Sequence, residues 1–370
     1  MILKIAYLSR STLPSRTANS IHVMKMCQAF VQNGHQVVLF ASIPNGYSEN
    51  IYSYYGVEKC FGLATHMLSG AIHGSSKAYI TSVLKRWGNS LPDLFYGRDL
   101  QGLLSAAPLG ISLILEAHRP PKSERHLHAI NDLLSCNNFN RLVVISASLR
   151  NEYLKLLPTL PENRIIVAPD GADLPQNDGS CKIKLHGENT GIKVGYIGHL
   201  YKGKGMEMIS QLAIKLPNID FHIIGGTEED INYWKSSVKN TDNIIFYGYL
   251  PHGQLAPYYR AFDIMLAPYQ HKVTFYQNTE NISPWMSPLK IFEYMAYSKA
   301  IIASDLPVLR EVLEHEVNCL LCPPTNVDAW VNALLKLKNN KELREHLEIT
   351  SHKIFVNKYT WKQRAKKVIK

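Results

Sequence analysis

A single carboxylate stands in a mostly apolar segment of the chain. Glu293 lies within residues 287–296, and prolines at positions 284 and 288 stiffen the loop before it. A buried acid needs hydrogen-bond partners, because an unpaired carboxylate is costly away from water. The hydroxyl groups of a bound sugar ring would supply such partners, so we interpret Glu293 as a candidate binding residue.

Lys290 precedes Glu293 by three residues. On a helix this spacing places the two side chains on one face. They could form an internal ion pair. Alternatively, both could point toward a ligand, with Lys290 binding phosphate and Glu293 binding hydroxyls. The spacing alone leaves both arrangements open.

A glycine-rich loop follows the predicted strand 192–197. It contains Gly198, His199, Lys204 and Gly205, and a predicted helix comes next. Free backbone N–H groups and the helix dipole favour an anion at such a place, and Lys204 adds a full positive charge. A pyrophosphate is the expected ligand, although a glycine turn with a solvated lysine explains the same pattern. The spacing matches neither GxxxxGK[ST] nor GxGxxG.

Two further candidates lie in the N-terminal half. His118 follows the predicted strand 111–116 and precedes two prolines that hold it in place. It could donate a hydrogen bond to a substrate hydroxyl, or it could be a structural histidine at a strand end. Arg16 and Asn19 belong to the loop before the first long helix, where Asn19 or Ser20 is also a good N-cap.

Acidic residues do not indicate a metal site. The sequence contains no DxD pair of the kind that binds a metal-bound sugar nucleotide. Glu228, Glu229 and Asp230 are typical of the charged first turn of a helix. We therefore expect a metal-independent site, in which lysines and backbone dipoles take the place of the cation.

Apolar runs of strand length alternate with helical patterns along the chain, which predicts α/β structure with parallel sheets covered by helices on both faces. The predicted strands are residues 2–8, 36–41, 111–116, 141–145, 164–167, 192–197, 219–224, 243–247, 263–267 and 300–303. The predicted helices include residues 19–33, 205–216 and 326–337. Ligands of such sheets bind beyond the carboxyl ends of the strands, where His118, Gly198 and Gly225 are expected.

The length of 370 residues predicts two domains. A polar, glycine-containing stretch without a clear period divides the chain and has the composition of a linker. We expect a first domain at residues 1–175, a linker at 176–191, a second domain at 192–354 and a C-terminal helix at 355–370.

The net charge is +10, from 40 basic and 30 acidic residues, and much of the C-terminal stretch is basic. We interpret that stretch as an amphipathic helix with Val356, Trp361 and Val368 turned inward. Its charge also favours contact with an anionic membrane or with phosphorylated substrates. No nucleic-acid-binding module accompanies the charge, so nucleic acid is not an expected partner.

Cysteines and hydropathy indicate a cytoplasmic protein, with peripheral membrane contact as the alternative. The six cysteines are scattered, and the CxxC at Cys319 and Cys322 has no second pair, so buried thiols are expected. No apolar run reaches the roughly 18 residues of a membrane span. The first eight residues predict a buried strand instead of a signal peptide.

The order and spacing of several short motifs resemble those of retaining, nucleotide-sugar-dependent glycosyltransferases of the group 1 or family 4 type. The motifs are residues 33–35, 144–146, 168–173, 198–205, 224–226, 246–251, 261–268, 287–296 and 304–312. The resemblance covers nearly the whole chain. It implies the GT-B fold, in which two Rossmann-like domains face a central cleft, with the acceptor on the first domain and the donor on the second. The C-terminal helix would cross back to the first domain.

The resemblance also implies roles for single residues. Lys204 would hold the donor pyrophosphate, and Glu293 would bind the ribose as the second glutamate of an E-x7-E motif. Backbone near Tyr249 and Leu250 would contact the base. His118 would lie near the reacting sugar. The pyrophosphate or the sugar would also be contacted by amides around Ser287, Pro288 and Leu289.

Three positions depart from the family pattern. Trp285 stands where the first glutamate of E-x7-E is expected, and His199 stands where an arginine usually accompanies the phosphate lysine. The glycine pair of the first loop is replaced around Arg16 and Asn19. A subset of the family carries this SPLK form without the first glutamate. Because His199 carries little charge near neutral pH, we hypothesise that Arg16 compensates.

The resemblance implies transfer of a sugar, with retention, from an NDP-sugar to an acceptor hydroxyl. UDP- and GDP-sugars are the first candidates, and no other cofactor is expected. The acceptor would be a sugar, a lipid-linked sugar or a polysaccharide in surface polysaccharide or glycolipid biosynthesis. Two alternatives stay open, a degenerate member that acts as an assembly partner and a sugar-nucleotide epimerase on the same fold.

Overall fold

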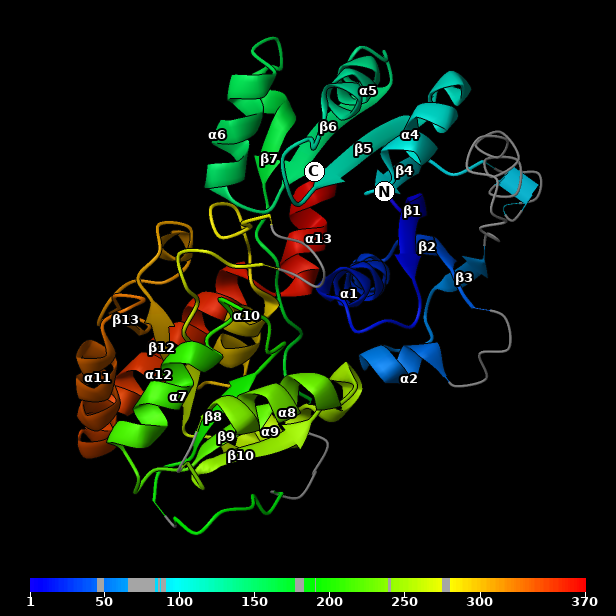
Figure 1. Cartoon of the computed structure of the whole chain (residues 1–370). Helices are drawn as coiled ribbons and strands as arrows, with labels where there is room; N and C mark the ends of the chain where they lie inside the picture. Colours follow the sequence, from blue (N-terminus) through cyan, green and yellow to red (C-terminus); the bar gives the residue numbers. More distant parts are fainter. Residues whose placement is uncertain are drawn as a thin grey trace. The chain divides into compact units, whose positions relative to one another are not determined.

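The computed structural model describes residues 1–44, 50–65, 84–85, 87, 91–176, 183–189, 191–238, 241–274 and 280–370. These residues form two compact units, which Figure 1 shows. Unit 1 is Met1–Pro169 together with Trp361–Lys370, and unit 2 is Asp170–Thr360. Each unit is a parallel sheet with helices, so the predicted α/β fold class with two Rossmann-like domains is confirmed. Within the predicted linker, residues 177–182 and 190 lie outside the described part.

Unit 1 contains a seven-stranded sheet in the order β3-β2-β1-β4-β5-β6-β7. Its strands are β1 Lys4–Thr12, β2 Gln36–Ser42, β3 Gly62–Thr65, β4 Leu94–Gly97, β5 Ser112–Ala117, β6 Phe139–Val144 and β7 Ile165–Val167. Its helices are α1 Ala18–Gln32, α2 Ile51–Tyr55, α4 Leu100–Ala106, α5 Glu124–Leu134, α6 Ala147–Leu156 and α13 Trp361–Ile369. Short 3-10 turns lie at Ala107–Leu109 and Glu162–Arg164.

Unit 2 contains a six-stranded sheet in the order β10-β9-β8-β11-β12-β13. Its strands are β8 Val194–Ile197, β9 Phe221–Ile224, β10 Ile244–Gly248, β11 Ile264–Ala267, β12 Ala300–Ser304 and β13 Leu320–Cys322. Its helices are α7 Met206–Lys215, α8 Glu228–Ser237, α9 Ala256–Ala261, α10 Leu289–Ala296, α11 Val327–Asn339 and α12 Lys341–Lys358. Short 3-10 turns lie at His252–Gln254 and Leu309–Glu311.

Three of the strands escape prediction from the sequence. These are β3, β4 and β13, which have only four, four and three residues. Such runs are too short to show a period of their own. β4 nevertheless lies in the middle of its sheet, where it pairs with β1 on one side and β5 on the other. Its place is set by these neighbours instead of by local sequence.

The start of α1 differs from the expectation. Thr17 is the N-cap, and its side chain accepts a hydrogen bond from the backbone N–H of Ser20. The prediction of Asn19 or Ser20 as the cap was therefore wrong. Asn19 has other partners, because its amide donates to the Ser11 hydroxyl at 2.6 Å and accepts from Arg98. The predicted charged first turn at Glu228–Asp230 is confirmed, with a capping box formed by Thr227 and Asp230.

The C-terminal stretch consists of two helices. α12 ends at Lys358 within unit 2, and α13 begins at Trp361 and packs beside α1 in unit 1 (Figure 1). Trp361 and Val368 are buried, as predicted, but Val356 is 36% exposed. That prediction was wrong because α12 buries Leu347, Ser351 and Phe355, which are spaced by four residues and leave position 356 off the inward stripe.

Two further expectations are met in the interior. Cys319 and Cys322 are buried, free thiols, as predicted for this CxxC. None of the described helices combines the length and the apolar character that a membrane span requires.

Glycines align the carboxyl ends of three strands in unit 2. The Gly198 N–H donates to the Ile224 carbonyl at 2.9 Å, and the Gly225 N–H donates to the Gly248 carbonyl at 2.7 Å. A Cβ at Gly225 would lie 2.0 Å from the Gly198 oxygen, and Gly225 has a φ of +123°. Only glycine therefore permits this close approach of β8 and β9.

We predict that Gly225→Ala lowers the free energy of unfolding by about 2–4 kcal/mol, through overpacking and backbone strain. Urea denaturation followed by circular dichroism measures this loss. The matched control is Gly191→Ala, because a Cβ at Gly191 meets nothing within 4 Å. Equal unfolding midpoints for the two variants would contradict the role given to Gly225.

Candidate functional site

Two lysine side chains converge in unit 2. Lys290 lies in the first turn of α10, and its Nζ is 3.6 Å from the centre of the Tyr196 ring and 5.2 Å from that of Tyr269. Lys204 ends the glycine-rich loop, and its Nζ is 5.7 Å from the centre of the same Tyr269 ring. Lys290 is only 7% exposed, and its Nζ has no hydrogen-bond partner among the described residues. The sequence-predicted phosphate residues are thus brought together over two tyrosines.

The electrostatics of this pair favour an anion. Burial lowers the pKa of Lys204 to about 8. Burial and the charge of Lys204 hold the pKa of Lys290 well below its ordinary value, and Glu293 opposes this shift. A negative ligand shared by two buried ammonium groups stabilises the charged form of both. The arrangement can therefore bind a polyanion such as a diphosphate.

Backbone groups and a tyrosine complete the surroundings of the lysines. A Cβ at Gly198 would lie 2.7 Å from the Lys290 Nζ, so glycine lets the ammonium approach the main chain. The Tyr196 hydroxyl donates to the His199 carbonyl at 2.7 Å and lies 3.2 Å from the Lys204 carbonyl, which holds the loop. The His199 ring stacks on Tyr201 with 4.7 Å between centroids.

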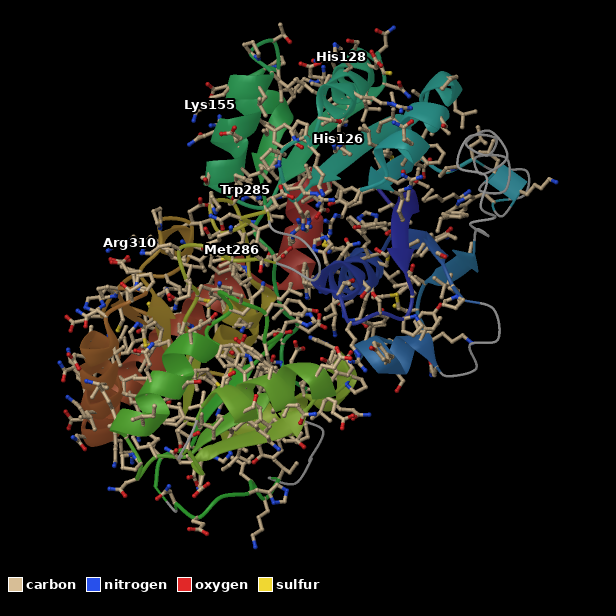
Figure 2. All side chains as sticks on the ribbon, viewed as in Figure 1. His126, His128, Lys155, Trp285, Met286 and Arg310 are labelled. Atoms are coloured by element: carbon tan, nitrogen blue, oxygen red, sulfur yellow. The ribbon has the colours of Figure 1, made fainter. Side chains whose placement is uncertain are left out.

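The start of α10 presents further donors. Pro288 is the N-cap, and no side chain caps the helix. Ser287 is engaged elsewhere, since its hydroxyl accepts from the Asp170 N–H at 2.8 Å. The first N–H groups of a helix have no partner within the helix, so those at Leu289 and Lys290 suit an anion. Trp285, labelled in Figure 2 on the segment that leads into α10, is half-buried.

Glu293 has protein partners that the sequence did not reveal. Its Oε1 is 2.5 Å from the Nε2 of His252, and its Oε2 accepts from the Tyr259 hydroxyl at 2.6 Å. Glu293 therefore has partners within the protein, and its binding of ligand hydroxyls stays a prediction. The alternative of an internal pair with Lys290 was wrong, because the Lys290 Nζ has no hydrogen-bond partner among the described residues. Glu293 keeps 13% of its side chain exposed.

His252 links Glu293 to the segment after β10. Tyr249 and Leu250 follow β10 and are half-buried, and His252 begins the next 3-10 turn. The contact between His252 and Glu293 therefore ties the start of α10 to residues 249–250. Sequence reasoning missed His252, although its place two residues after Leu250 could have drawn attention to it.

In unit 1, His118 contacts a buried carboxylate. Its Nε2 lies 2.5 Å from the Oε1 of Glu116, the penultimate residue of β5. Burial and the charge of Arg98 lower the pKa of His118 to about 3, against the opposing effect of Glu116. His118 is therefore neutral at pH 7.

The other predicted residues of unit 1 lie on the loop between β1 and α1. Arg16 is exposed there, and Asn19 is held by Ser11 and Arg98 as described above. Arg98 was missed because it follows β4, a strand that the sequence did not predict. The predicted site residues thus form two groups, one in each unit.

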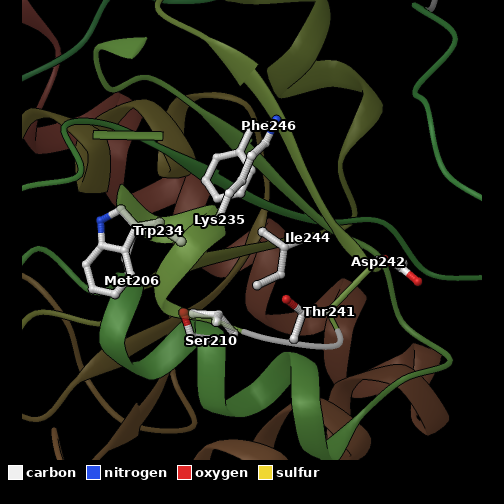
Figure 3. Close-up of a pocket in the computed structure, with 9 residues that line it drawn as sticks. Met206, Ser210, Trp234, Lys235, Thr241, Asp242, Ile244 and Phe246 are labelled. Atoms are coloured by element: carbon white, nitrogen blue, oxygen red, sulfur yellow. The ribbon is translucent and has the colours of Figure 1, made fainter. Parts of the chain in front are cut away.

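A separate surface pocket of about 560 Å³ lies in unit 2 between α7, α8 and β10, and Figure 3 shows its lining. The lining residues are Met206, Ser210, Trp234, Lys235, Val238, Thr241, Asp242, Ile244 and Phe246. None of the sequence-predicted site residues is among them. It adjoins the glycine-rich loop at Trp234, whose Nε1 donates to the Leu200 carbonyl at 3.1 Å.

Comparison with known sequences gives two family matches. Residues 182–353 match the model described as Glycosyl transferases group 1, and residues 20–176 match the model described as Glycosyltransferase Family 4. An uncharacterized glycosyltransferase of Haemophilus influenzae is 30% identical over 153 residues. That match covers 40% of this chain and 39% of the relative's own length.

Comparison with solved structures gives similar folds over the whole chain. Sucrose-phosphate synthase from Thermosynechococcus elongatus has a TM-score of 0.70 at 17% identity, over 99% of this chain and 97% of that chain. Anabaena HepE in complex with UDP-glucose has a TM-score of 0.68 at 12% identity, over 99% of this chain and 98% of that chain. These likenesses show the GT-B fold.

We predict that Lys204 titrates far below an ordinary lysine, with a midpoint near pH 8 in the free protein. NMR of ¹³C-dimethylated lysines measures this midpoint, and Lys204→Arg identifies the resonance by its loss. The exposed Lys338, on α11, is the internal reference resonance. A Lys204 resonance that titrates together with Lys338 would contradict the burial argument.

Proposed function

Because the chain belongs to the glycosyltransferases of group 1 and family 4, we propose that it transfers a sugar from an NDP-sugar to an acceptor hydroxyl with retention of configuration. The observation that carries the proposal is the Lys204 and Lys290 pair. Both ammonium groups lie near the Tyr269 ring, and the Lys290 Nζ has no hydrogen-bond partner among the described residues. UDP- and GDP-sugars are the proposed donors.

The proposed reaction makes a nucleoside diphosphate the leaving group. As the bond between the anomeric carbon and the phosphate oxygen breaks, the electron pair passes to the phosphate, and negative charge grows there. Preorganised cations and N–H groups stabilise such charge most strongly in a partly dry site. Lys204, Lys290 and the first turn of α10 would do this. They supply positive charge that a divalent cation provides in other transferases, so we propose a metal-independent reaction.

Retention is proposed to follow from attack on the face that the diphosphate leaves. The acceptor oxygen forms its bond to the anomeric carbon, and its proton passes to the departing phosphate. No side chain needs to act as a nucleophile in this scheme. His118 would contact the reacting sugar, and Arg16 and Asn19 would lie on the acceptor side.

The remaining donor contacts are proposed for unit 2. Glu293, held by His252 and Tyr259, would accept from the ribose hydroxyls. Backbone at Tyr249 and Leu250 would contact the base. Amides of Gly198, His199 and residues 287–289 would contact the pyrophosphate or the sugar.

The acceptor is proposed to be a sugar, a lipid-linked sugar or a polysaccharide, in surface polysaccharide or glycolipid biosynthesis. Lysines at the C-terminal end are exposed and would suit a peripheral contact with an anionic membrane. These lysines are Lys358, Lys362, Lys366, Lys367 and Lys370.

Transfer or slow hydrolysis of UDP-, GDP-, ADP- or dTDP-sugars tests the proposed function. For the accepted donor, we predict that Lys290→Met lowers kcat/KM by about 100-fold or more, because it removes a cation from the leaving group. The amount of nucleoside diphosphate formed is measured by chromatography. The matched control is Lys338→Met, a change of the same type on the exposed face of α11.

Two outcomes would count against the assignment. If the protein converted the donor to an epimer, its function would be epimerisation and not transfer. Equal kcat/KM for Lys290→Met and Lys338→Met would remove the lysine pair from the reaction.

We further predict that Glu293→Gln weakens the binding of a nucleoside diphosphate through the ribose alone. Wild-type protein should bind UDP about 10-fold more tightly than 2′-deoxy-UDP, because a hydrogen bond to a charged group is worth roughly 1.5–3 kcal/mol. The neutral variant should show a smaller preference for UDP. Isothermal titration calorimetry gives the two affinities. An unchanged preference for UDP in the variant would rule out the ribose contact.

A further inference from the structure

Glu116 is the centre of a buried polar cluster in unit 1. Its carboxylate is contacted from α1 by the Nε2 of His22 at 2.7 Å and from the end of β5 by the Nε2 of His118 at 2.5 Å. The Tyr96 hydroxyl of β4 donates to its Oε2. From α13, the Nη2 of Arg364 donates to its Oε1 at 2.9 Å. One acid thus joins four elements.

Arg364 is buried and has hydrogen-bond partners besides Glu116. Its side chain is only 3% exposed. Besides Glu116, it donates to the Pro169 carbonyl at 3.0 Å and to the Ala168 carbonyl at 3.2 Å. Arg364 belongs to the basic C-terminal stretch, but unlike the lysines of that stretch it is buried. The guanidinium belongs to the interior because a buried carboxylate needs a cation.

The charge state of Glu116 follows from these neighbours. Burial alone would raise its pKa, but Arg364, His22 and the hydrogen bond from His118 outweigh this and hold the pKa well below its usual value. Glu116 is therefore ionised at neutral pH. An ionised carboxylate only accepts hydrogen bonds.

The protonation of the His118 ring follows from Glu116. His118 is neutral at pH 7, so only one of its ring nitrogens carries a proton. The Nε2 faces the acceptor-only carboxylate and must be that nitrogen. The Nδ1 is then left with a lone pair and accepts hydrogen bonds. The sequence had left open whether His118 donates to a substrate hydroxyl or is a structural histidine.

We propose that Arg364 and Glu116 are positioning residues that hold His118 as the Nε2–H tautomer, so that its Nδ1 accepts a hydrogen bond from a hydroxyl of the sugar substrate. The choice of a sugar rests on the proposed function. Helix α13, the last element of the chain, is by this account part of the site of unit 1. No proton leaves His118 during the reaction.

The first measurement needs no substrate. Long-range ¹H–¹⁵N NMR of the histidine rings distinguishes the two neutral tautomers, and His118→Gln identifies the His118 signals. At pH 7 the full-length protein should show the Nε2–H pattern for His118. A Nδ1–H or an imidazolium pattern would overturn the proposal.

The second measurement uses variants of the positioning residues. Arg364→Met leaves the buried charge of Glu116 uncompensated, so this variant could fail to fold. The double variant Glu116→Gln with Arg364→Met removes both charges and keeps similar volumes. The Gln amide can donate as well as accept, so His118 should lose its single tautomer. Glu162→Gln with Arg150→Met, the same two changes at a solvent-accessible ion pair of unit 1, is the matched control.

The kinetic outcome separates positioning from a merely structural role. For the double variant we expect kcat to fall about 10-fold to 100-fold. Loss of a residue that orients a metal ligand has an effect of this size in metal sites. The Kd for the nucleoside diphosphate should be unchanged. A wild-type kcat together with an altered tautomer would overturn the proposal. If the wild-type protein transfers no sugar, the proposed function fails, while the NMR pattern still decides how His118 is held.

Discussion

The burial of the Lys204 and Lys290 ammonium groups is the constraint on which the candidate site of unit 2 depends. Burial removes water from both groups, which lie near one tyrosine, and the charge of Lys204 further disfavours the charged form of Lys290. Three features of the fold hold the two lysines in place. Helix α10 positions Lys290, the Tyr196 hydroxyl holds the loop that ends at Lys204, and Gly198 leaves room for the ammonium. A bound anion would stabilise the positive charges of this pair.

Unit 1 contains a buried negative charge whose hydrogen-bond partners are all in place. Glu116 is as buried as Lys290, yet its oxygens have donors from four elements, and Arg364 balances its charge. A satisfied buried charge holds its neighbours in place, whereas an unsatisfied one attracts a ligand. In the proposed reaction, unit 2 would offer positive charge to the leaving group, and unit 1 would offer a neutral, oriented imidazole.

The sequence predicts the local parts of this structure well and the long-range contacts poorly. Buried parallel strands are apolar runs, so most strands are visible in the sequence, and a glycine-rich loop before a helix is a local pattern. The short strands β3, β4 and β13 are not visible in this way, because their neighbours determine them. Contacts such as His252 with Glu293 and Arg364 with Glu116 join residues 41 and 248 positions apart. No spacing rule connects such residues, so the partners of both acids became visible only in the folded chain.

A crystal structure with a bound nucleoside diphosphate tests the central claim most directly. The account predicts that phosphate oxygens lie within about 3 Å of the Nζ atoms of Lys204 and Lys290, with further contacts to the first N–H groups of α10. A diphosphate bound elsewhere, for example in the pocket between α7, α8 and β10, with both ammonium groups unengaged, would contradict it.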